Sequence, residues 1–480
     1  MLEWGVSAQR KEGYNLSLRK LSPAEERVVE EVSDRFKETS KRRELGGQEN
    51  EKRYISELVA EYCRENSLSI DSEQRDYLAK YSFLNILGLC GIDLLLEDDG
   101  VEEIGVIGIN KPVYVYIAGS GWKETNLIFR SESIVTDVIN KIARSLGRRI
   151  TFQNPTLNAV LPDGSRLHAS IPPISHVEMT IRKFRSRPIS IPDLLNYKTY
   201  SLEALAFLSL VFQSDYSVIV AGNTASGKTS TLNALFSYIP LNERILIIEE
   251  TPEINIPHKH VIKMLSNVGL QINMRSLVED TLRMRPDRVI VGEVRTPEEV
   301  SALIETILSG QARGSYATFH AQSSDEAVKR IVSLGVLPID VASLDFIVVQ
   351  RRMLRYDTKT RRSWEERRGV EIAEVLQEDS RPKINPIFSL NTKTGGMSGS
   401  PIRASRIDEI ADNFSITRKE LMEEIDRRKR MIEKISRKSE EFANSVFEIQ
   451  NSLFKLGGEI SESQADKASE RDAENTFAIS

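Results

Sequence analysis

Short apolar runs mark candidate strands in the second half of the chain. They lie at 216–221, 245–250, 288–293 and 314–319, as expected for strands buried on both faces of a sheet. Thr229 to Tyr238 has a helical pattern directly after the first run. This alternation of strand and helix predicts a mostly parallel, doubly wound sheet over 201–402.

The preceding region has a different pattern, with turn residues between shorter candidate strands. A helix is predicted over 131–146, and Gly147 is well placed to end it. Strands are predicted at 103–109, 113–118, 157–161, 166–170 and 178–184. These elements predict a smaller α+β domain over 96–186.

The first region, 1–95, is predicted to be helical and highly charged. Ser22 and Glu25 can form a capping box with Pro23 in the first turn. An apolar stripe then follows at helical spacing, formed by Val28, Val29, Val32 and Phe36. The stripe favours packing on a neighbouring helix, and a partner-docking surface is the alternative.

Three further segments complete the predicted organisation. Residues 187–200 contain two prolines and little apolar periodicity, which predicts a linker. Residues 403–457 carry apolar positions in alternating steps of three and four, with Arg428 and Ser439 in two vacant places. Helices packed on their own domain are preferred there, and an intermolecular coiled coil stays open. Residues 458–480 are polar and predicted to be disordered.

Composition narrows the class of protein. The 480 residues include 40% hydrophobic and 28% charged residues, which is ordinary for a globular protein, and the net charge of −5 argues against a protein that wraps nucleic acid. Two cysteines, Cys63 and Cys90, predict neither a disulfide framework nor a zinc site. No signal peptide is expected at Met1 to Gly13, and the longest apolar runs are too short to span a bilayer.

The strongest local signal follows the strand predicted at 216–221. Gly222 to Thr229 match G-x-x-x-x-G-K-[ST] without a mismatch, between a predicted strand and a predicted helix. Main-chain N–H groups of such a loop bind phosphates, Lys228 is expected to reach the β- and γ-phosphates, and Thr229 to bind Mg²⁺. The predicted nucleotide-binding residues are Gly222, Asn223, Thr224, Ala225, Ser226, Gly227, Lys228, Thr229 and Ser230.

Three other predicted strands end in residues that could assist hydrolysis. Glu249 and Glu250 end one strand, Glu293 ends another after Gly292, and His320 follows a third. Open α/β sheets place ligands at the carboxyl ends of their strands, so these residues are expected near the phosphate loop. The segment 282–287 is expected to add arginines to the same rim.

From about residue 83 to residue 450, the sequence resembles the secretion and type IV pilus-assembly ATPases, the motors of type II and type IV secretion machines. Its sequence pattern is most similar to that of the archaeal branch, which includes the archaellum motor. Besides the phosphate loop, the matching segments are Gly91–Asp98, Leu161–Arg166, Thr180–Phe184, Ile248–Glu253, Arg285–Asp287, Val291–Arg295 and Thr318–His320.

The resemblance implies a homo-hexamer whose subunits carry an N-terminal domain and a RecA-like ATPase domain. It assigns an acidic box to Glu249, Glu250 and Glu253, and water activation to Glu293. It implies phosphate-binding arginines in the N-terminal domain, for which Arg182 is the best candidate and Arg166 the second. Arg295 and His320 complete the candidate catalytic residues.

The resemblance further implies work at a membrane. The expected cofactor is Mg²⁺ with ATP as substrate, and no zinc is expected. The expected partner is a polytopic membrane platform protein of a pilus or secretion machine, without specific nucleic acid. The expected location is cytoplasmic, peripherally bound to the cytoplasmic face of the membrane.

Two departures and two alternatives remain. The first of two histidines common in the family is absent, and Gln311 or Arg313 is a candidate to replace it. The zinc-binding tetracysteine insert of many bacterial members is absent as well, which favours the archaeal branch. A RecA-like helicase or DNA translocase is the first alternative, although basic loops interleaved with aromatic residues are lacking. A nucleotide-binding adaptor without hydrolysis is the second.

Overall fold

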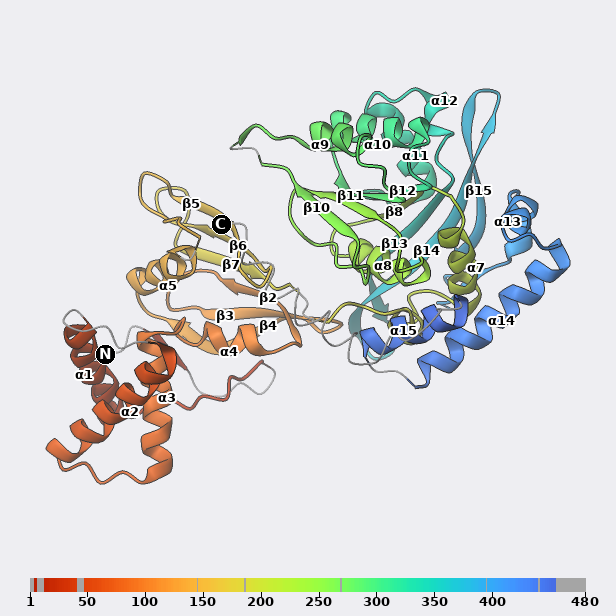
Figure 1. Ribbon diagram of the computed structural model, residues 1–480. Coiled ribbons are helices and arrows are strands. Elements are labelled where there is room, and N and C mark those ends of the chain that lie inside the picture. Colours follow the sequence, from red (N-terminus) through yellow and green to blue (C-terminus); the bar gives the residue numbers. More distant parts are fainter. Residues whose placement is uncertain are drawn as a thin grey trace. The chain divides into compact units, whose positions relative to one another are not determined.

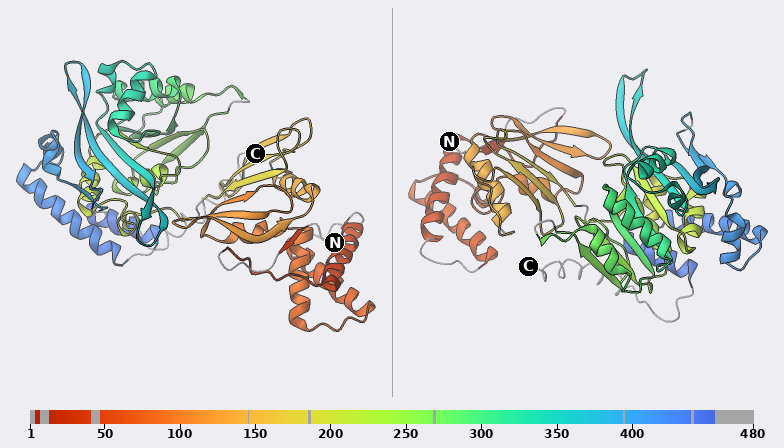
Figure 2. Two further views of the ribbon diagram at one scale, coloured as in Figure 1. Left: turned by 180° about the vertical axis from the view of Figure 1, so that it is seen from behind. Right: turned by 90° about the horizontal axis from the view of Figure 1, so that it is seen from above.

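The computed structural model describes residues 4–6, 13–40, 47–144, 146–184, 187–267, 270–393, 395–438 and 441–454. The chain forms two compact units, Met1–Ser186 and Arg187–Ser480. Figure 1 labels the elements of both units, and Figure 2 gives two further views. The predicted tail 458–480 and Ser439 lie outside the described residues.

Three helices of the first unit pack on one another: α1 (Pro23–Ser40), α2 (Gln48–Glu65) and α3 (Ser72–Ile86). The predicted capping box is confirmed, since the Ser22 amide donates to Glu25 Oε2 at 2.8 Å and the Glu25 amide donates to Ser22 Oγ at 3.4 Å. The stripe from Val28 to Phe36 is buried in the unit's core. The prediction that it packs within its own unit is therefore confirmed.

The same core also contains the sheet of the first unit, so the regions 1–95 and 96–186 share one hydrophobic cluster. The sheet order is β1-β4-β3-β2-β7-β6-β5, with antiparallel neighbours throughout the described pairs. The strands are β1 (Trp4–Val6), β2 (Val101–Val106), β3 (Pro112–Ile117), β4 (Gly121–Phe129), β5 (Thr156–Val160), β6 (Arg166–Ser170) and β7 (Glu178–Arg182), with α4 (Ile92–Glu97) and α5 (Glu132–Arg144). Strand β1 was not predicted, because three residues are too few to show an alternation of apolar and polar positions.

The second unit is built on a sheet of order β10-β9-β11-β12-β8-β13-β14-β15-β16. Neighbours from β10 to β13 are parallel, and those from β13 to β16 are antiparallel. The strands are β8 (Val218–Gly222), β9 (Ile245–Glu249), β10 (Val261–Leu265), β11 (Arg288–Val294), β12 (Gly314–Phe319), β13 (Phe346–Asp357), β14 (Arg362–Glu378), β15 (Arg381–Leu390) and β16 (Met397–Gly399). This is the predicted RecA-like α/β fold with an antiparallel extension that was not predicted.

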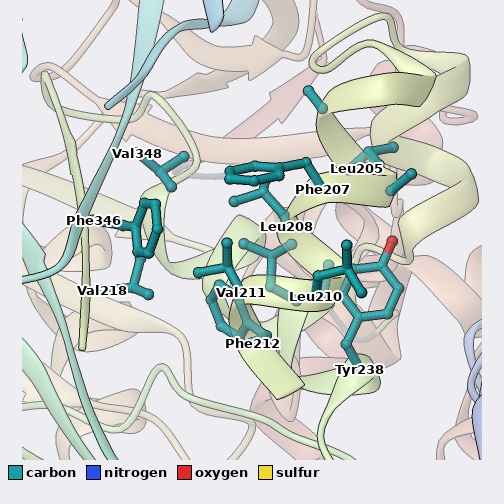
Figure 3. Packing of buried hydrophobic residues seen from close by; sticks show 14 of the residues in the cluster. Leu205, Phe207, Leu208, Leu210, Val211, Phe212, Val218, Tyr238, Phe346 and Val348 are labelled. Atoms are coloured by element: carbon teal, nitrogen blue, oxygen red, sulfur yellow. The ribbon is translucent and has the colours of Figure 1, made fainter. Parts of the chain in front are cut away.

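Helices cover both faces of this sheet (Figures 1 and 2). Helices α9 (Met274–Thr281), α10 (Pro297–Ser309), α11 (Ser324–Ser333) and α12 (Pro338–Val341) enclose one hydrophobic cluster with the sheet. On the other face lie α7 (Leu202–Gln213), α8 (Lys228–Leu235), the short helix η1 (Phe236–Tyr238), α13 (Ile407–Asn413), α14 (Arg418–Ser436) and α15 (Phe442–Leu453). Figure 3 shows α7, whose Phe207 and Val211 point toward Phe346 of β13. The two parallel-sheet faces are thus both covered, as the continuous apolar strands predict.

The expectation of a linker over 187–200 is wrong for the middle of that segment. Helix α6 (Ile191–Asn196) begins there with a Ser190 capping box and Pro192 in its first turn. Ile191 and Leu194 are buried in the core of the second unit. Proline fits the first turn of a helix without breaking it, so two prolines were a poor indicator of a flexible segment.

The C-terminal helices pack on their own unit, as preferred over an intermolecular coiled coil. Helix α14 packs on α7 and α6, and its apolar stripe is buried there. Arg428, in a vacant position of the stripe, donates to Ser209 Oγ at 2.9 Å and to Glu424 Oε1 at 2.7 Å. A buried arginine with two such partners belongs to an intramolecular contact.

Candidate functional site

The phosphate-loop motif joins the end of β8 to the start of α8. Ala225 and Gly227 have positive φ angles of 57° and 94°, which curl the chain tightly before Lys228 begins the helix. The N-terminus of α8 lies directly behind this curl, so main-chain N–H groups and the helix dipole favour an anion there. Strand, loop and helix are in the predicted places.

The two glycines of the motif also allow a close approach to β13. A Cβ on Gly222 would lie 2.0 Å from the Gln350 carbonyl oxygen, and a Cβ on Gly227 would lie 2.9 Å from Gln350 Nε2. Any side chain at Gly222 would therefore collide with the main chain of the neighbouring strand. Gln350 is a site residue that sequence analysis missed.

Lys228 and Thr229 occupy the first turn of α8. Lys228 is buried except for 9% of its surface, and its Nζ lies 3.4 Å from the Asn223 carbonyl oxygen, on the loop itself. Thr229 Oγ1 donates to Glu253 Oε2 at 3.1 Å. A lysine on the loop and a hydroxyl beside a carboxylate are the groups that a magnesium–triphosphate requires.

The three acids after β9 have different environments. Glu249 is 2% exposed, and its Oε1 accepts from the amides of Glu253 at 2.8 Å and Ile254 at 2.9 Å, so it shapes the loop that carries Glu253. Its other oxygen is buried without a hydrogen-bond partner. Burial raises the pKa of Glu249 to about 7. Glu250 is exposed and pairs with Arg295 at 3.1 Å.

Glycine at 292 brings the end of β11 close to β9. A Cβ there would lie 2.7 Å from Cγ of Glu249. The pairing of β11 with β12 shifts register between Val291 and Val294, and Thr318 Oγ1 donates to the Gly292 carbonyl at 2.6 Å. This irregularity displaces Glu293 from the regular ladder at the carboxyl edge of the sheet.

Glu293 lies between a cation and an imidazole. Its Oε2 pairs with the Arg295 guanidinium, and its Oε1 lies 2.5 Å from Nε2 of His320. Burial would raise the pKa of Glu293, but Arg295, His320 and Lys228 together outweigh it and lower that pKa. Glu293 is therefore ionised at neutral pH.

The surroundings of His320 favour its neutral form, whereas those of Glu293 favour the charged form. Burial and the charge of Lys228 lower its pKa, against the opposing pull of Glu293. The imidazole is thus neutral at neutral pH, and its short contact with a carboxylate requires the proton on Nε2. Glu249, Glu293 and His320 therefore meet at one edge of the sheet with Lys228, as the strand-end argument predicted.

Other predicted cations do not lie at this edge. The segment 282–287 precedes β11 and Arg313 precedes β12, which places both at the amino edge of the parallel sheet. Arg313 pairs there with Asp287 at 3.2 Å and Glu243 at 2.8 Å. Because β12 spans about 20 Å, Arg313 cannot replace a histidine beside Glu293 in the same subunit. The expectation of extra arginines on the rim was wrong for the same reason, and Gln311 also precedes β12.

Arg166 and Arg182 belong to the first unit. They are paired across β6 and β7 in the sheet register, and Arg182 is exposed while Arg166 is partly buried. Two like charges directly opposite each other are unfavourable unless an anion or carboxylate lies near. Glu103 of β2 pairs with Arg182 on its other side.

Neither a multidentate metal centre nor a membrane-spanning element occurs among the described residues. In that part of the chain, no three His, Cys, Asp or Glu side chains gather with metal-binding geometry. The oxygen donors of Thr229 and Glu253 nevertheless fit Mg²⁺, which keeps most of its ligands from water and substrate phosphates. Within the same described residues, every helix is too short or too polar to cross a bilayer.

Comparison with known proteins places this site in a family. The chain is 36% identical over 329 residues to an uncharacterized protein of Methanocaldococcus jannaschii, covering 63% of this chain and 43% of that protein. It is 30% identical over 284 residues to the type IV secretion system protein VirB11 of Bartonella henselae, covering 51% of this chain and 78% of the relative. The crystal structure of the VirB11 ATPase from the Brucella suis type IV secretion system, in complex with sulphate, matches 59% of this chain and 95% of its own at 24% identity, with a TM-score of 0.30.

A second uncharacterized protein of Methanocaldococcus jannaschii is 31% identical over 342 residues, covering 68% of this chain and 60% of that protein. The chain thus spans 43% and 60% of the lengths of these two relatives. The family model described as type II/IV secretion system protein matches residues 102–451, which include both the sheet of the first unit and the phosphate loop. This chain belongs to the type II/IV secretion system protein family.

Proposed function

We propose that this protein hydrolyses ATP and converts the hydrolysis into work for a filament-assembly or secretion machine. One observation carries the proposal: the phosphate loop, the Thr229–Glu253 pair and the Glu293–His320 pair share one edge of the sheet. A cradle, a magnesium-binding hydroxyl and a water-orienting acid are the minimum set for phosphoryl transfer to water.

Lys228 and the amides of Gly227 to Thr229 bind the phosphates in this proposal. Thr229 and Glu253 are the residues that would hold Mg²⁺, since their side-chain oxygens lie side by side at the loop. When bound, the ion would supply positive charge for the phosphoryl group that is transferred. Glu249 keeps Glu253 in place through its two main-chain contacts.

Glu293 orients and deprotonates the attacking water. Its lowered pKa keeps it ionised, while Arg295 and His320 fix its two oxygens. Each carboxylate oxygen has two acceptor sites, and Arg295 and His320 each use one. A site therefore remains that can bind the attacking water. Neutral His320 donates to Glu293 and does not compete for the proton.

Three further assignments are suggested by the family and not by the geometry of this chain: the oligomeric state, the phosphate-binding arginines and the partner. We propose a homo-hexamer in which Arg182, with Arg166 beside it in the register, reaches the phosphates of a nucleotide. The proposed partner is a polytopic platform protein, with the hexamer at the cytoplasmic face of the membrane. Arg166 and Arg182 lie directly opposite each other on β6 and β7, on one face of the sheet, so both could approach the same anion.

Lys228→Ala tests the proposal. Nucleotide binding should fall at least a hundredfold, because a buried cation that meets the phosphates is lost without a substitute. Equilibrium titration with a fluorescent ATP analogue measures the loss, and phosphate release measures turnover. Lys329→Ala, an exposed lysine of α11 paired with Asp325, is the matched control and should behave as wild type. Normal turnover in Lys228→Ala would refute the proposed function.

A further inference from the structure

A buried glutamine lies directly beneath the phosphate loop. Gln350 is 3% exposed near the middle of β13, and its Nε2 donates to the Ser226 carbonyl at 2.6 Å. Its Oε1 accepts from Tyr200 Oη at 2.9 Å and from Thr231 Oγ1 at 2.5 Å. Both ends of the amide are therefore engaged, which fixes its orientation.

Two further residues of the β13–β14 hairpin (346–378) contact the phosphate loop. Arg367 of β14 donates from Nε to the Ala225 carbonyl at 3.0 Å. The Asn223 side chain bridges the main chain of Arg352, accepting from its amide at 2.8 Å and donating to its carbonyl at 3.0 Å. Three successive parts of the loop are thus attached to one hairpin.

Holding a carbonyl also directs the next N–H group. The peptide unit is planar and trans, so the N–H of one residue points away from the preceding carbonyl. A bond to the Ser226 carbonyl therefore turns the Gly227 N–H to the opposite side, away from Gln350. A bond to the Ala225 carbonyl similarly directs the Ser226 N–H, which closes the turn onto the Asn223 carbonyl at 3.2 Å.

We propose that Gln350 and Arg367 are positioning residues that keep the phosphate loop in its anion-binding shape. They hold the loop from the carbonyl side: Gln350 keeps the Gly227 N–H directed at phosphate, and Arg367 keeps the turn that the Ser226 N–H closes onto the Asn223 carbonyl. This inference rests on the proposed function and names residues outside the phosphate-loop motif. The hairpin thereby becomes part of the nucleotide site.

The test compares three single variants of the full chain. Gln350→Met keeps the length of the side chain and removes its hydrogen bonds, and Arg367→Gln removes the guanidinium. Arg355→Gln is the matched control, since Arg355 lies on the same hairpin and its ion pair is with Glu366 at 2.6 Å. Binding of a fluorescent ADP analogue and the KM and kcat of phosphate release are measured for each.

Gln350→Met and Arg367→Gln should each weaken binding about tenfold and raise KM about as much, with kcat changed less than about threefold. Arg355→Gln should bind as wild type. Arg367→Lys, which retains a cationic donor, should recover most of the affinity. Simple misfolding would instead reduce the active fraction and therefore kcat, without a change in the affinity of the folded fraction.

Affinities within twofold of wild type for both Gln350→Met and Arg367→Gln would overturn the inference. Should Gln350→Met fail to fold, the partly exposed Arg367 decides alone. Loss of binding in Lys228→Ala with normal binding in these variants would leave the proposed function standing and remove only the positioning role. A wild-type protein that binds no nucleotide would overturn both.

Discussion

The two edges of the parallel sheet both carry charged residues, yet they use them differently. At the amino edge, Arg288 is fully buried and bonds to Glu243 at 2.8 Å, to Tyr316 Oη at 3.0 Å and to the Ser214 carbonyl at 3.0 Å. At the carboxyl edge, Glu249 keeps a buried oxygen without a hydrogen-bond partner and has a pKa raised to about 7. Arg288 at the amino edge thus has its charge matched by several partners, whereas Glu249 at the carboxyl edge is desolvated with one carboxylate oxygen unbonded.

This difference separates charges that stabilise from charges that act. A fully partnered buried ion pair gains nothing from a ligand, whereas a desolvated acid with a raised pKa gains free energy when a cation approaches. Substitutions at the carboxyl edge should therefore change turnover or binding, and those at the amino edge should change stability.

The largest effect on turnover is expected for Glu293→Gln. The amide cannot accept a proton from water, so kcat should fall about 10²–10⁴-fold while nucleotide affinity stays near wild type. Single-turnover phosphate release and analogue titration measure the two quantities. The free energy of unfolding should change little, because Gln can keep a contact with His320. If single-turnover rates remain near wild type, another group activates the water.

The largest effect on stability is expected at the opposite edge, for Arg288→Leu. Loss of the guanidinium leaves Glu243 in an apolar setting with Arg313 as its remaining ion-pair partner. The free energy of unfolding of the second unit should fall by about 3–5 kcal/mol. Urea denaturation at pH 7 measures this change. Nucleotide affinity of the folded fraction should be unchanged, and a selective loss of affinity would contradict the division between the edges.

The carboxyl edge was largely predictable because its signals are local. The phosphate loop is one continuous segment, and Glu249, Glu293 and His320 each end an apolar strand. The direction of parallel strands then brings these ends together. The same rule places Arg285 and Arg313 at the amino edge, since each precedes its strand. Their closeness in sequence to Glu293 and His320 wrongly suggested that they lie at the same edge.

Residues that act through long-range contacts were not predictable. Gln350 lies 124 positions from Ser226, and a single glutamine at the end of an apolar stretch carries no motif. The outer half of the β13–β14 hairpin is rich in arginine and glutamate, so it has no strand-like apolar run. The hairpin reaches the phosphate loop because β13 pairs with the distant strand β8, Phe346 with Val218, and periodicity does not encode that pairing.

Glu249→Gln should reveal the strain at the carboxyl edge. The folded pKa of about 7 exceeds the ordinary value of 4.5, so ionisation opposes folding above pH 7 and this penalty disappears as the pH falls to about 4.5. Glutamine avoids the charge, and at pH 8 the free energy of unfolding should rise by about 2–3 kcal/mol. At pH 4.5 the gain should be largely lost.

Urea denaturation of the nucleotide-free protein at both pH values measures the Glu249→Gln effect. Glu250→Gln is the neighbouring control: that side chain is exposed, and its stability change should stay within about 0.5 kcal/mol at either pH. Turnover of Glu249→Gln should fall despite the gain in stability, because a neutral amide oxygen holds the amides of Glu253 and Ile254 less strongly than a carboxylate does. Equal stability changes for the two variants would show that burial does not strain Glu249.

The smallest effect is expected for Arg313→Gln, which asks whether the amino edge contributes to hydrolysis at all. Arg313 is about half exposed and pairs with Glu243, which keeps its buried partner Arg288 in the variant. Because Arg313 is half exposed and Glu243 keeps its pair with Arg288, the free energy of unfolding should fall by only about 0.5–1 kcal/mol. Turnover per chain should stay within twofold of wild type, since Arg313 lies a full strand away from Glu293. A drop beyond tenfold with normal stability would mean that this arginine meets the nucleotide of another subunit, because no contact within its own sheet could produce such a loss.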